Sequence, residues 1–119
     1  MITKENKKLT YFKTYKLKIR HNQKLEYKFE NSRLIVSQNG TKLMECYYKP
    51  RGFYGFPEVI YGCKRFYKDE TQSGGCSTFN GLIKFAESEL GRKIDKTIIE
   101  KFEAVITMQK LENESEKDI

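Results

Sequence analysis

Alternation of apolar and polar residues predicts two strands near the start of the chain. The segment 15–20, YKLKIR, places three apolar side chains on one side and three cations, Lys16 and Lys18 among them, on the other. The segment 24–30, KLEYKFE, alternates in the same way and has Lys28 at one of its polar positions. A period of two is typical of half-buried strands, so we expect both segments to lie in a sheet with a partly cationic outer face.

The polar residues 21–23 between these segments predict a hairpin loop. With a short loop there, Leu17 faces Tyr27 and Lys18 faces Glu26 across the two strands. We therefore expect part of the charge on this hairpin to be neutralised by cross-strand pairs.

A second hairpin is predicted at residues 33–48, RLIVSQNGTKLMECYY. Its Asn39-Gly40 pair can occupy the two positive-φ positions of a type I′ turn, which joins antiparallel strands without splaying them. The expected core positions of this hairpin are Leu34, Val36 and Leu43.

A further strand or pair of strands is expected within residues 56–67. Pro50 and Pro57 are assigned to turns or strand starts, because proline cannot donate a hydrogen bond to a ladder. The following segment 69–75, DETQSGG, is rich in turn-forming residues and is interpreted as a polar loop.

After this loop the apolar period changes from two to about 3.6, which predicts two helices. The first begins with Ser77 or Thr78 as its N-cap and ends at Gly91. The second has Asp95 as its N-cap and carries an apolar stripe as far as Leu111. The expected helix stripes contain Phe79, Leu82, Ile83, Ala86 and Leu90 in the first helix, and Ile98, Ile99, Phe102, Val105 and Ile106 in the second.

Strands followed by helices indicate an α+β fold. We expect an antiparallel sheet of four to five strands, made of two hairpins plus a further strand or pair, with two C-terminal helices packed on one face. Residues 1–111 are interpreted as a single domain, because 119 residues are too few for two domains of ordinary size. Residues 112–119, ENESEKDI, lack an apolar anchor and are expected to form a frayed acidic tail. The second face of the sheet is then free to meet a ligand.

Charge is distributed unevenly along the chain. The formal net charge is +7, but residues 1–68 hold sixteen Lys and Arg against five acids, whereas residues 69–119 hold seven against eleven. A basic half attracts polyanions, and an acidic half favours contact with a basic protein surface. No stretch reaches the ~20 apolar residues of a membrane span and no export signal is recognised, so we expect a cytoplasmic protein without a membrane partner.

Metal binding and catalysis are disfavoured by the residue types present. Cys46, Cys63 and Cys76 lie 17 and 13 residues apart, unlike a disulfide framework or paired zinc ligands, so we expect reduced thiols, no metal and no cofactor. A Cys3His zinc site with His21 and a thiol enzyme centred on Cys76 are the alternatives. Because the chain has one histidine and its helical carboxylates are expected to face solvent, we expect no enzymatic activity. Residues 73–78, SGGCST, are interpreted as a loop with a helix cap rather than as an anion site.

Half of the sixteen Tyr and Phe residues lie in one basic stretch, 47–68, YYKPRGFYGFPEVIYGCKRFYK. Within it residues 51–56, RGFYGF, resemble in part the basic-Gly-aromatic-Gly-aromatic core of the RNA-recognition motif, whose strand aromatics stack bases. Tyr54 interrupts the alternation of that core, Pro57 follows where a strand residue is needed, and residues 20–48 look like hairpins where that family has a helix. We therefore do not assign the chain to the family. The stretch still combines rings that can stack bases with cations that can hold phosphates.

These features lead to the hypothesis of a small non-enzymatic protein that binds nucleic acid through a basic, aromatic-rich sheet face. The alternative is a phage or mobile-element inhibitor of host defence, similar to an anti-CRISPR protein, that docks on a nuclease or other nucleic-acid-handling protein. Eighteen Lys against five Arg favours this alternative, because it is typical of the AT-rich coding bias of many such elements. The candidate contact residues in either case are Lys16, Lys18, Lys28, Tyr48, Lys49, Arg51, Phe53, Tyr54, Lys64 and Arg65.

Overall fold

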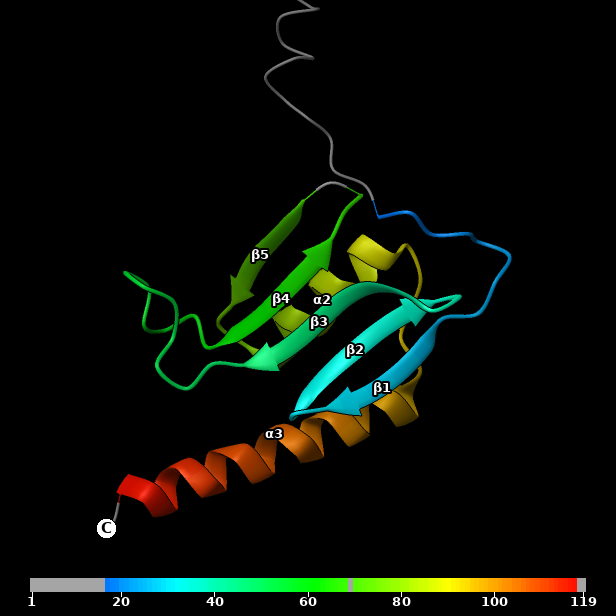
Figure 1. The fold of residues 1–119 in the computed structure, drawn as a ribbon. Coiled ribbons are helices and arrows are strands. Elements are labelled where there is room, and N and C mark those ends of the chain that lie inside the picture. Colours follow the sequence, from blue (N-terminus) through cyan, green and yellow to red (C-terminus); the bar gives the residue numbers. More distant parts are fainter. Residues whose placement is uncertain (1–16, 69, 118–119) are drawn as a thin grey trace, which may run out of the picture.

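The computed structural model describes residues 17–68 and 70–117, which form a five-stranded antiparallel sheet followed by two helices (Figure 1). The strands run across the sheet in sequence order, so each strand pairs with the next one along the chain. This arrangement confirms the predicted α+β fold. The elements are β1 (Glu26–Glu30), β2 (Arg33–Gln38), β3 (Thr41–Tyr48), β4 (Tyr61–Phe66), β5 (Thr71–Cys76), α2 (Phe79–Leu90) and α3 (Lys96–Lys117).

Two-residue turns with positive φ join the first three strands. Asn39 and Gly40, between β2 and β3, have φ values of 52° and 77°, as the predicted type I′ turn requires. Asn31 and Ser32, between β1 and β2, have φ values of 53° and 62° and form a turn of the same kind. The second turn lacks the glycine that usually marks such turns, so it has no clear sequence signal.

The predicted hairpin between residues 15–20 and 24–30 is wrong. Residues 17–20 belong to no strand, and β1 pairs with β2 instead. The apolar Leu17 and Ile19 nevertheless pack against the core. An irregular segment beside a sheet satisfies the same alternating pattern as a strand within it, so alternation alone does not distinguish the two.

Gln38 holds residues 20–23 against the end of β2. It is 4% exposed, and its side chain accepts a hydrogen bond from the Arg20 backbone N–H (2.7 Å). The same amide donates to the carbonyl oxygens of Arg20 (2.9 Å) and Gln23 (3.1 Å). The guanidinium of Arg92, just after α2, donates to the Gln23 carbonyl as well (2.7 Å). The buried amide of Gln38 thus takes the place of the expected ladder and ties this segment to the sheet, and Arg92 ties it to the end of α2.

The expected polar loop at 69–75 is also wrong, because Thr71–Cys76 forms the edge strand β5. Neighbouring side chains leave no room for a Cβ on Gly75, where it would overlap Val59. Gly75 therefore marks close packing over a strand rather than a turn. A Cβ on Gly74 would make only an ordinary contact, 3.4 Å from the Arg65 side chain. In the expected strand region 56–67, β4 begins only at Tyr61.

Both helices begin where their sequence signals indicate. The Thr78 hydroxyl accepts a hydrogen bond from the Gly81 N–H (3.0 Å), and α2 ends at Gly91, whose φ is 69°. Helix α3 begins directly after Asp95 and continues to Lys117, so the helix extends beyond its expected end at residue 111. Within the described residues, neither helix has an apolar stretch of the length needed to cross a membrane.

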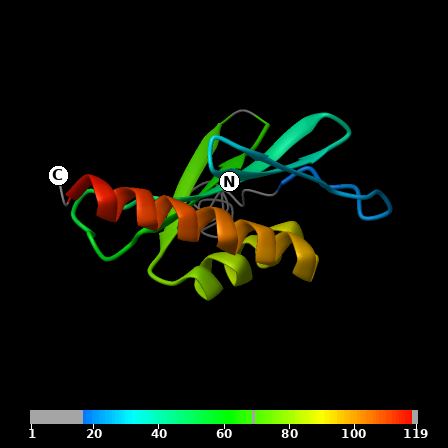
Figure 2. The same cartoon turned by 90° about the horizontal axis from the view of Figure 1, so that it is seen from below.

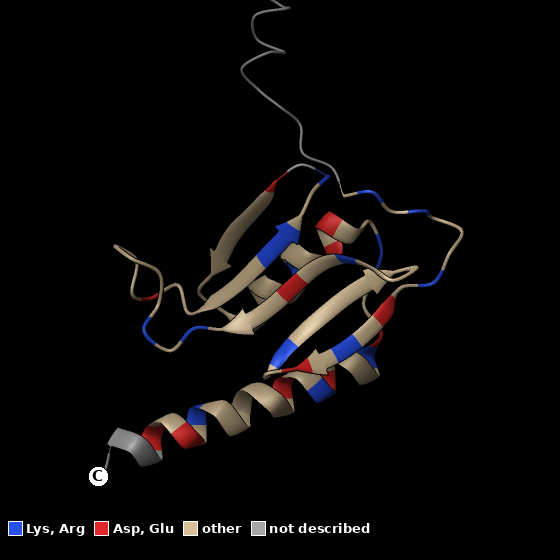
Figure 3. Ribbon diagram, viewed as in Figure 1, with Lys and Arg blue, Asp and Glu red and all other residues tan. Residues whose placement is uncertain are grey.

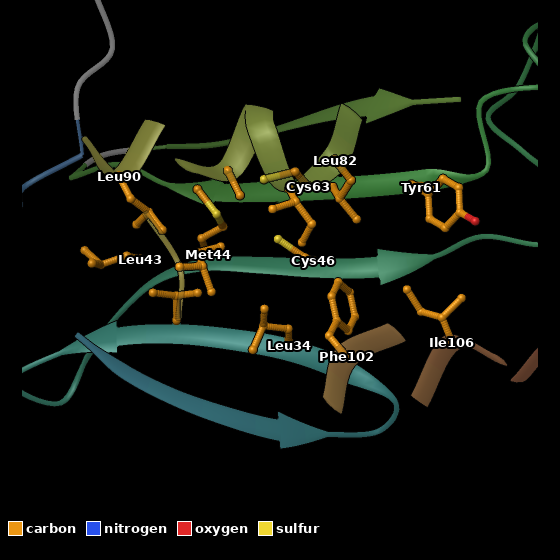
Figure 4. Close-up of a cluster of buried hydrophobic side chains, with 14 residues drawn as sticks. Leu34, Leu43, Met44, Cys46, Tyr61, Cys63, Leu82, Leu90, Phe102 and Ile106 are labelled. Atoms are coloured by element: carbon orange, nitrogen blue, oxygen red, sulfur yellow. The ribbon is translucent and has the colours of Figure 1, made fainter. Parts of the chain in front are cut away.

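Both helices cover the same face of the sheet, as predicted (Figures 1 and 2). Helix α2 packs against β4 and β5, and α3 packs against β2 and β3. Phe102 of α3 is fully buried between the layers, with its ring centroid 5.6 Å from that of Phe79 and 6.3 Å from that of Phe29. The core (Figure 4) includes the three positions expected from the sequence, Leu34, Val36 and Leu43.

Replacing the buried amide, as in Gln38→Leu, should destabilise the fold and loosen the segment before β1. The partly buried Arg20 N–H would lose its acceptor, whereas the carbonyls of Arg20 and Gln23 would lose one donor each and keep their bonds with Arg92. We therefore expect the free energy of unfolding to fall by about 1–3 kcal/mol. Hydrogen exchange at the Arg20 amide should become faster. Urea denaturation and hydrogen–deuterium exchange measure the two effects.

The matched control is Asn22→Leu, which changes an exposed amide in the same segment. It should change the free energy of unfolding by less than about 0.5 kcal/mol. Unchanged exchange at Arg20 in Gln38→Leu would contradict the role given to this side chain.

Candidate nucleic-acid interface

The face of the sheet opposite α2 and α3, called here the open face, is covered by neither helix (Figure 2). Because Leu34, Cys46 and Cys63 point into the core, their neighbours along each strand point to this face. Charged residues of both signs occur along neighbouring strands of the sheet (Figure 3). One row across the open face consists of Lys28, Ile35, Glu45, Lys64 and Ser73.

Glu45 neutralises two of the cations on the open face. Its carboxylate lies 3.0 Å from Arg33 Nη1 and 2.9 Å from Lys42 Nζ, and its side chain is 12% exposed. Burial by itself raises the pKa of Glu45, but the hydrogen bonds and charges of Lys42 and Arg33 outweigh it and hold the pKa below its ordinary value. Lys28 pairs in the same way with Glu30 (3.0 Å). These cations are less available to a phosphate than their number suggests.

Two strand glycines make room for aromatic rings on the open face. Tyr47 of β3 extends over Gly62 of β4, where a Cβ would overlap its ring. Phe53 lies over Gly75 of β5 in the same way. Both rings therefore rest against the backbone of the sheet.

Each ring on the open face has a cation beside it. The guanidinium carbon of Arg33 is 4.4 Å from the ring centroid of Tyr47, and Lys49 Nζ is 4.5 Å from that of Phe53. Phe66 of β4 has two lysine ammonium groups near its ring, at 5.4 Å and 5.3 Å. All of these distances are in the range of cation–π attraction. We call the following seven residues the platform: Arg33, Lys42, Tyr47, Lys49, Phe53, Lys64 and Phe66.

Between β3 and β4, residues 49–60 form a loop that protrudes from the sheet (Figure 1). Near its tip, Phe53 and Phe56 exchange backbone hydrogen bonds of 3.2 Å and 2.8 Å. The turn between them places Gly55 at a φ of 81°, as the third position of a type II turn requires. Tyr54 is 102% exposed in this turn, and Phe56 is 60% exposed.

The structure brings half of the candidate residues together. Lys28 lies on the open face in its pair with Glu30, Lys18 is exposed but outside the sheet, and Lys16 lies outside the described residues. The candidates that lie on the platform or in its adjoining loop are Lys49, Arg51, Phe53, Tyr54 and Lys64.

Tyr48 and Arg65 do not reach the open face. Tyr48 lies on the helix-covered face, with its ring centroid 5.9 Å from that of Tyr61. Arg65 Nη1 is 2.9 Å from the Glu89 carboxylate of α2, and the guanidinium carbon is 4.9 Å from the ring centroid of Phe85. Consecutive strand residues point to opposite faces. Tyr48 and Arg65 each lie two residues from a core cysteine of the same strand, so they point to the helix-covered face.

Several platform residues have only indirect signals in the sequence. Once Leu34 and Val36 are assigned to the core, alternation places Arg33 on the opposite face. Gly62, a glycine inside a strand, indicates that another side chain packs over it, and that side chain is Tyr47. Sequence reasoning missed these residues because it did not fix which face each strand position occupies.

The other chemistry considered from the sequence lies elsewhere in the fold. The pKa of Cys46 is raised well above its ordinary value. The larger cause is a hydrogen bond with the Cys63 thiol, and the second is burial. Burial also raises the pKa of Cys76, opposite to the change that a reactive thiol needs. Among the described residues, no three His, Cys, Asp or Glu side chains gather as a metal site would require.

Comparisons with protein-family models, with curated proteins and with solved structures find no match to this chain.

Two neighbouring cations of β4 should respond differently to the same substitution. Arg65→Met leaves the half-buried Glu89 carboxylate without its partner, so we expect the free energy of unfolding to fall by about 1–3 kcal/mol. Lys64→Met changes an outward-facing residue and should cost less than about 0.5 kcal/mol. Denaturant titration at neutral pH measures both changes. Equal destabilisation by the two variants would contradict the faces assigned to them.

Proposed function

We propose that the protein is a non-enzymatic cytoplasmic protein that binds nucleic acid through the platform and the adjoining loop, residues 49–60. The observation that carries this proposal is the presence of three aromatic rings, each beside a cation, on the face that α2 and α3 leave open. Rings of this kind stack bases and cations hold phosphates, which is how many sheet proteins bind nucleic acid.

Three cations are best placed to contact phosphates. Arg33 and Lys42 share the Glu45 carboxylate, which leaves them only part of their charge for a ligand. Within the part of the chain that the structure describes, Lys49, Arg51 and Lys64 have no ion pair. All three lie on the platform or in its loop, so we assign the principal phosphate contacts to them.

Binding should weaken as salt increases. Each phosphate contact contributes about −0.7 to −0.9 to the slope of log affinity against log salt, so three contacts give a slope of roughly −2 to −3. The double variant Lys49→Gln/Lys64→Gln should lower the affinity and make the slope less steep by about 1.5. Fluorescence anisotropy with labelled DNA and RNA at several salt concentrations measures both quantities.

The matched control is Lys84→Gln/Lys101→Gln, which removes the same charge from exposed positions on the helical layer. This control should keep most of the affinity and nearly the whole slope. Failure of every DNA and RNA probe to bind in a salt-dependent way would rule out the proposal.

A second candidate function is docking on a nucleic-acid-handling protein, as a phage or mobile-element inhibitor of host defence would do. It is favoured by α3, whose C-terminal turns extend past the strands (Figures 1 and 2). Met108 is 58% exposed and Leu111 is 53% exposed, and they share one stripe with the exposed Ala104. Glu112 and Glu114 follow on the same helix. An apolar stripe beside acidic residues suits a partner with a basic surface.

Chemical crosslinking in a nuclease-treated cell extract tests this second candidate. A protein partner should still be captured after nucleic acid has been digested, and Met108→Glu/Leu111→Glu should abolish its capture by placing charge in the stripe. Ser88→Glu, which adds a charge at an exposed position of α2 away from the stripe, is the control and should retain it. A crosslink that disappears on nuclease digestion would count against a direct protein partner.

A further inference from the structure

The turn at the tip of the 49–60 loop presents two aromatic side chains to solvent. Tyr54 and Phe56 are two of the four large hydrophobic residues that are exposed among those the structure describes. The other two, Met108 and Leu111, lie on α3. Large apolar side chains gathered in one exposed place are typical of a binding site.

Backbone hydrogen bonds and close packing within the loop fix the conformation of this turn. Phe53 and Phe56 exchange backbone hydrogen bonds, and the Gly52 N–H donates to the Lys49 carbonyl (2.9 Å). Gly52 has a φ of 71° and lies so close to Pro57 that a Cβ would overlap the Pro57 backbone. The exposed rings are therefore carried by a preorganised turn, and a ligand does not have to order the loop before it binds.

The surroundings of the turn favour an anionic ligand that also has flat apolar faces. Lys49 and Arg51 lie in the loop with one acid, Glu58. The ring of Phe53 belongs both to the loop and to the platform, and Lys49 lies beside it at 4.5 Å. Phe53 therefore joins the platform to the loop, so a polymer bound along the open face can continue onto the tip.

We propose that this turn is a stacking site for unpaired bases, so that the ligand of the platform is single-stranded DNA or RNA. The inference rests on the proposed function and adds to it the class of nucleic acid. Bases inside a duplex are stacked on each other and expose only their edges, whereas unpaired bases offer their faces to aromatic side chains. The rings of Tyr54 and Phe56 receive such faces while Lys49 and Arg51 hold the adjoining phosphates.

Binding of labelled oligo-dT, oligo-U and a mixed-sequence duplex, each of about 15 nucleotides, tests the proposal by fluorescence anisotropy. The wild-type protein should bind at least one single strand more tightly than the duplex. Tyr54→Leu/Phe56→Leu should weaken single-strand binding by roughly tenfold to a hundredfold. Its salt slope and its duplex affinity should stay the same, because it removes no cation. Tighter binding of oligo-U would identify the ligand as RNA, and tighter binding of oligo-dT would identify it as DNA.

Two control variants separate stacking from a general effect of the loop. Tyr54→Phe keeps the ring and should keep the single-strand affinity. Met108→Ala/Leu111→Ala removes the other exposed apolar pair and should leave nucleic-acid binding unchanged. Because Tyr54 and Phe56 are exposed, the leucine variant should unfold at the same temperature as wild type, which circular dichroism checks.

Tyr54→Trp gives a readout that does not depend on affinity. The chain contains no Trp, so the substitution creates a single indole at the tip. Its fluorescence should be quenched when a single strand binds and should stay constant when the duplex binds. Constant fluorescence during single-strand binding that anisotropy detects would overturn the stacking site.

The remaining outcomes separate this inference from the proposed function. Equal affinity for single strands and duplex, with no loss in Tyr54→Leu/Phe56→Leu, would overturn the stacking site while leaving nucleic-acid binding by the platform in place. Absence of all binding would overturn both. Loss of a nuclease-resistant protein crosslink in the same variant, with single-strand affinity unchanged, would reassign the tip to a protein contact.

Discussion

The burial of one sheet face beneath α2 and α3 is the constraint on which the rest of the structure depends. Leu34, Cys46 and Cys63 point into that layer, and Phe102 fills it from the helical side. Because strand side chains alternate, fixing these positions inward fixes their neighbours outward. The core therefore decides which rings and cations meet on the open face, although it contributes none of the platform residues itself.

Elements whose ends depend on one or two residues could be predicted from the sequence. The turn at Asn39, the cap at Thr78 and the helix end at Gly91 each follow from backbone conformations that few residue types favour. The segment before β1 and the strand β5 could not be predicted in this way. Their places depend on contacts between residues far apart in the chain, namely the buried amide of Gln38 and the side chains that lie over Gly75.

For the candidate site, the sequence predicts that basic and aromatic residues are involved. It does not predict to which face of the sheet each of these side chains points. Alternation shows that Lys64 and Arg65 must point in opposite directions, but it does not show which of them points outward. That choice comes from packing, since Arg65 meets the Glu89 carboxylate of α2. In the same way, Tyr47 points to the open face and Tyr48 points to the helix-covered face. The aromatic-rich stretch 47–68 thus supplies both the interior and the surface, and its composition alone does not separate these roles.

The sequential order of the strands has a consequence for how the chain acquires its structure. Each strand pairs with its immediate successor, and two of the connections are two-residue turns. Pairings between neighbours close short loops, lose little chain entropy and favour rapid folding. Helix α3 is different, because it packs back onto β2 and β3 across most of the described chain. During synthesis the meander can therefore assemble early and α2 can cover β4 and β5, whereas the apolar face of β2 and β3 stays exposed to water and to other chains until α3 emerges and docks.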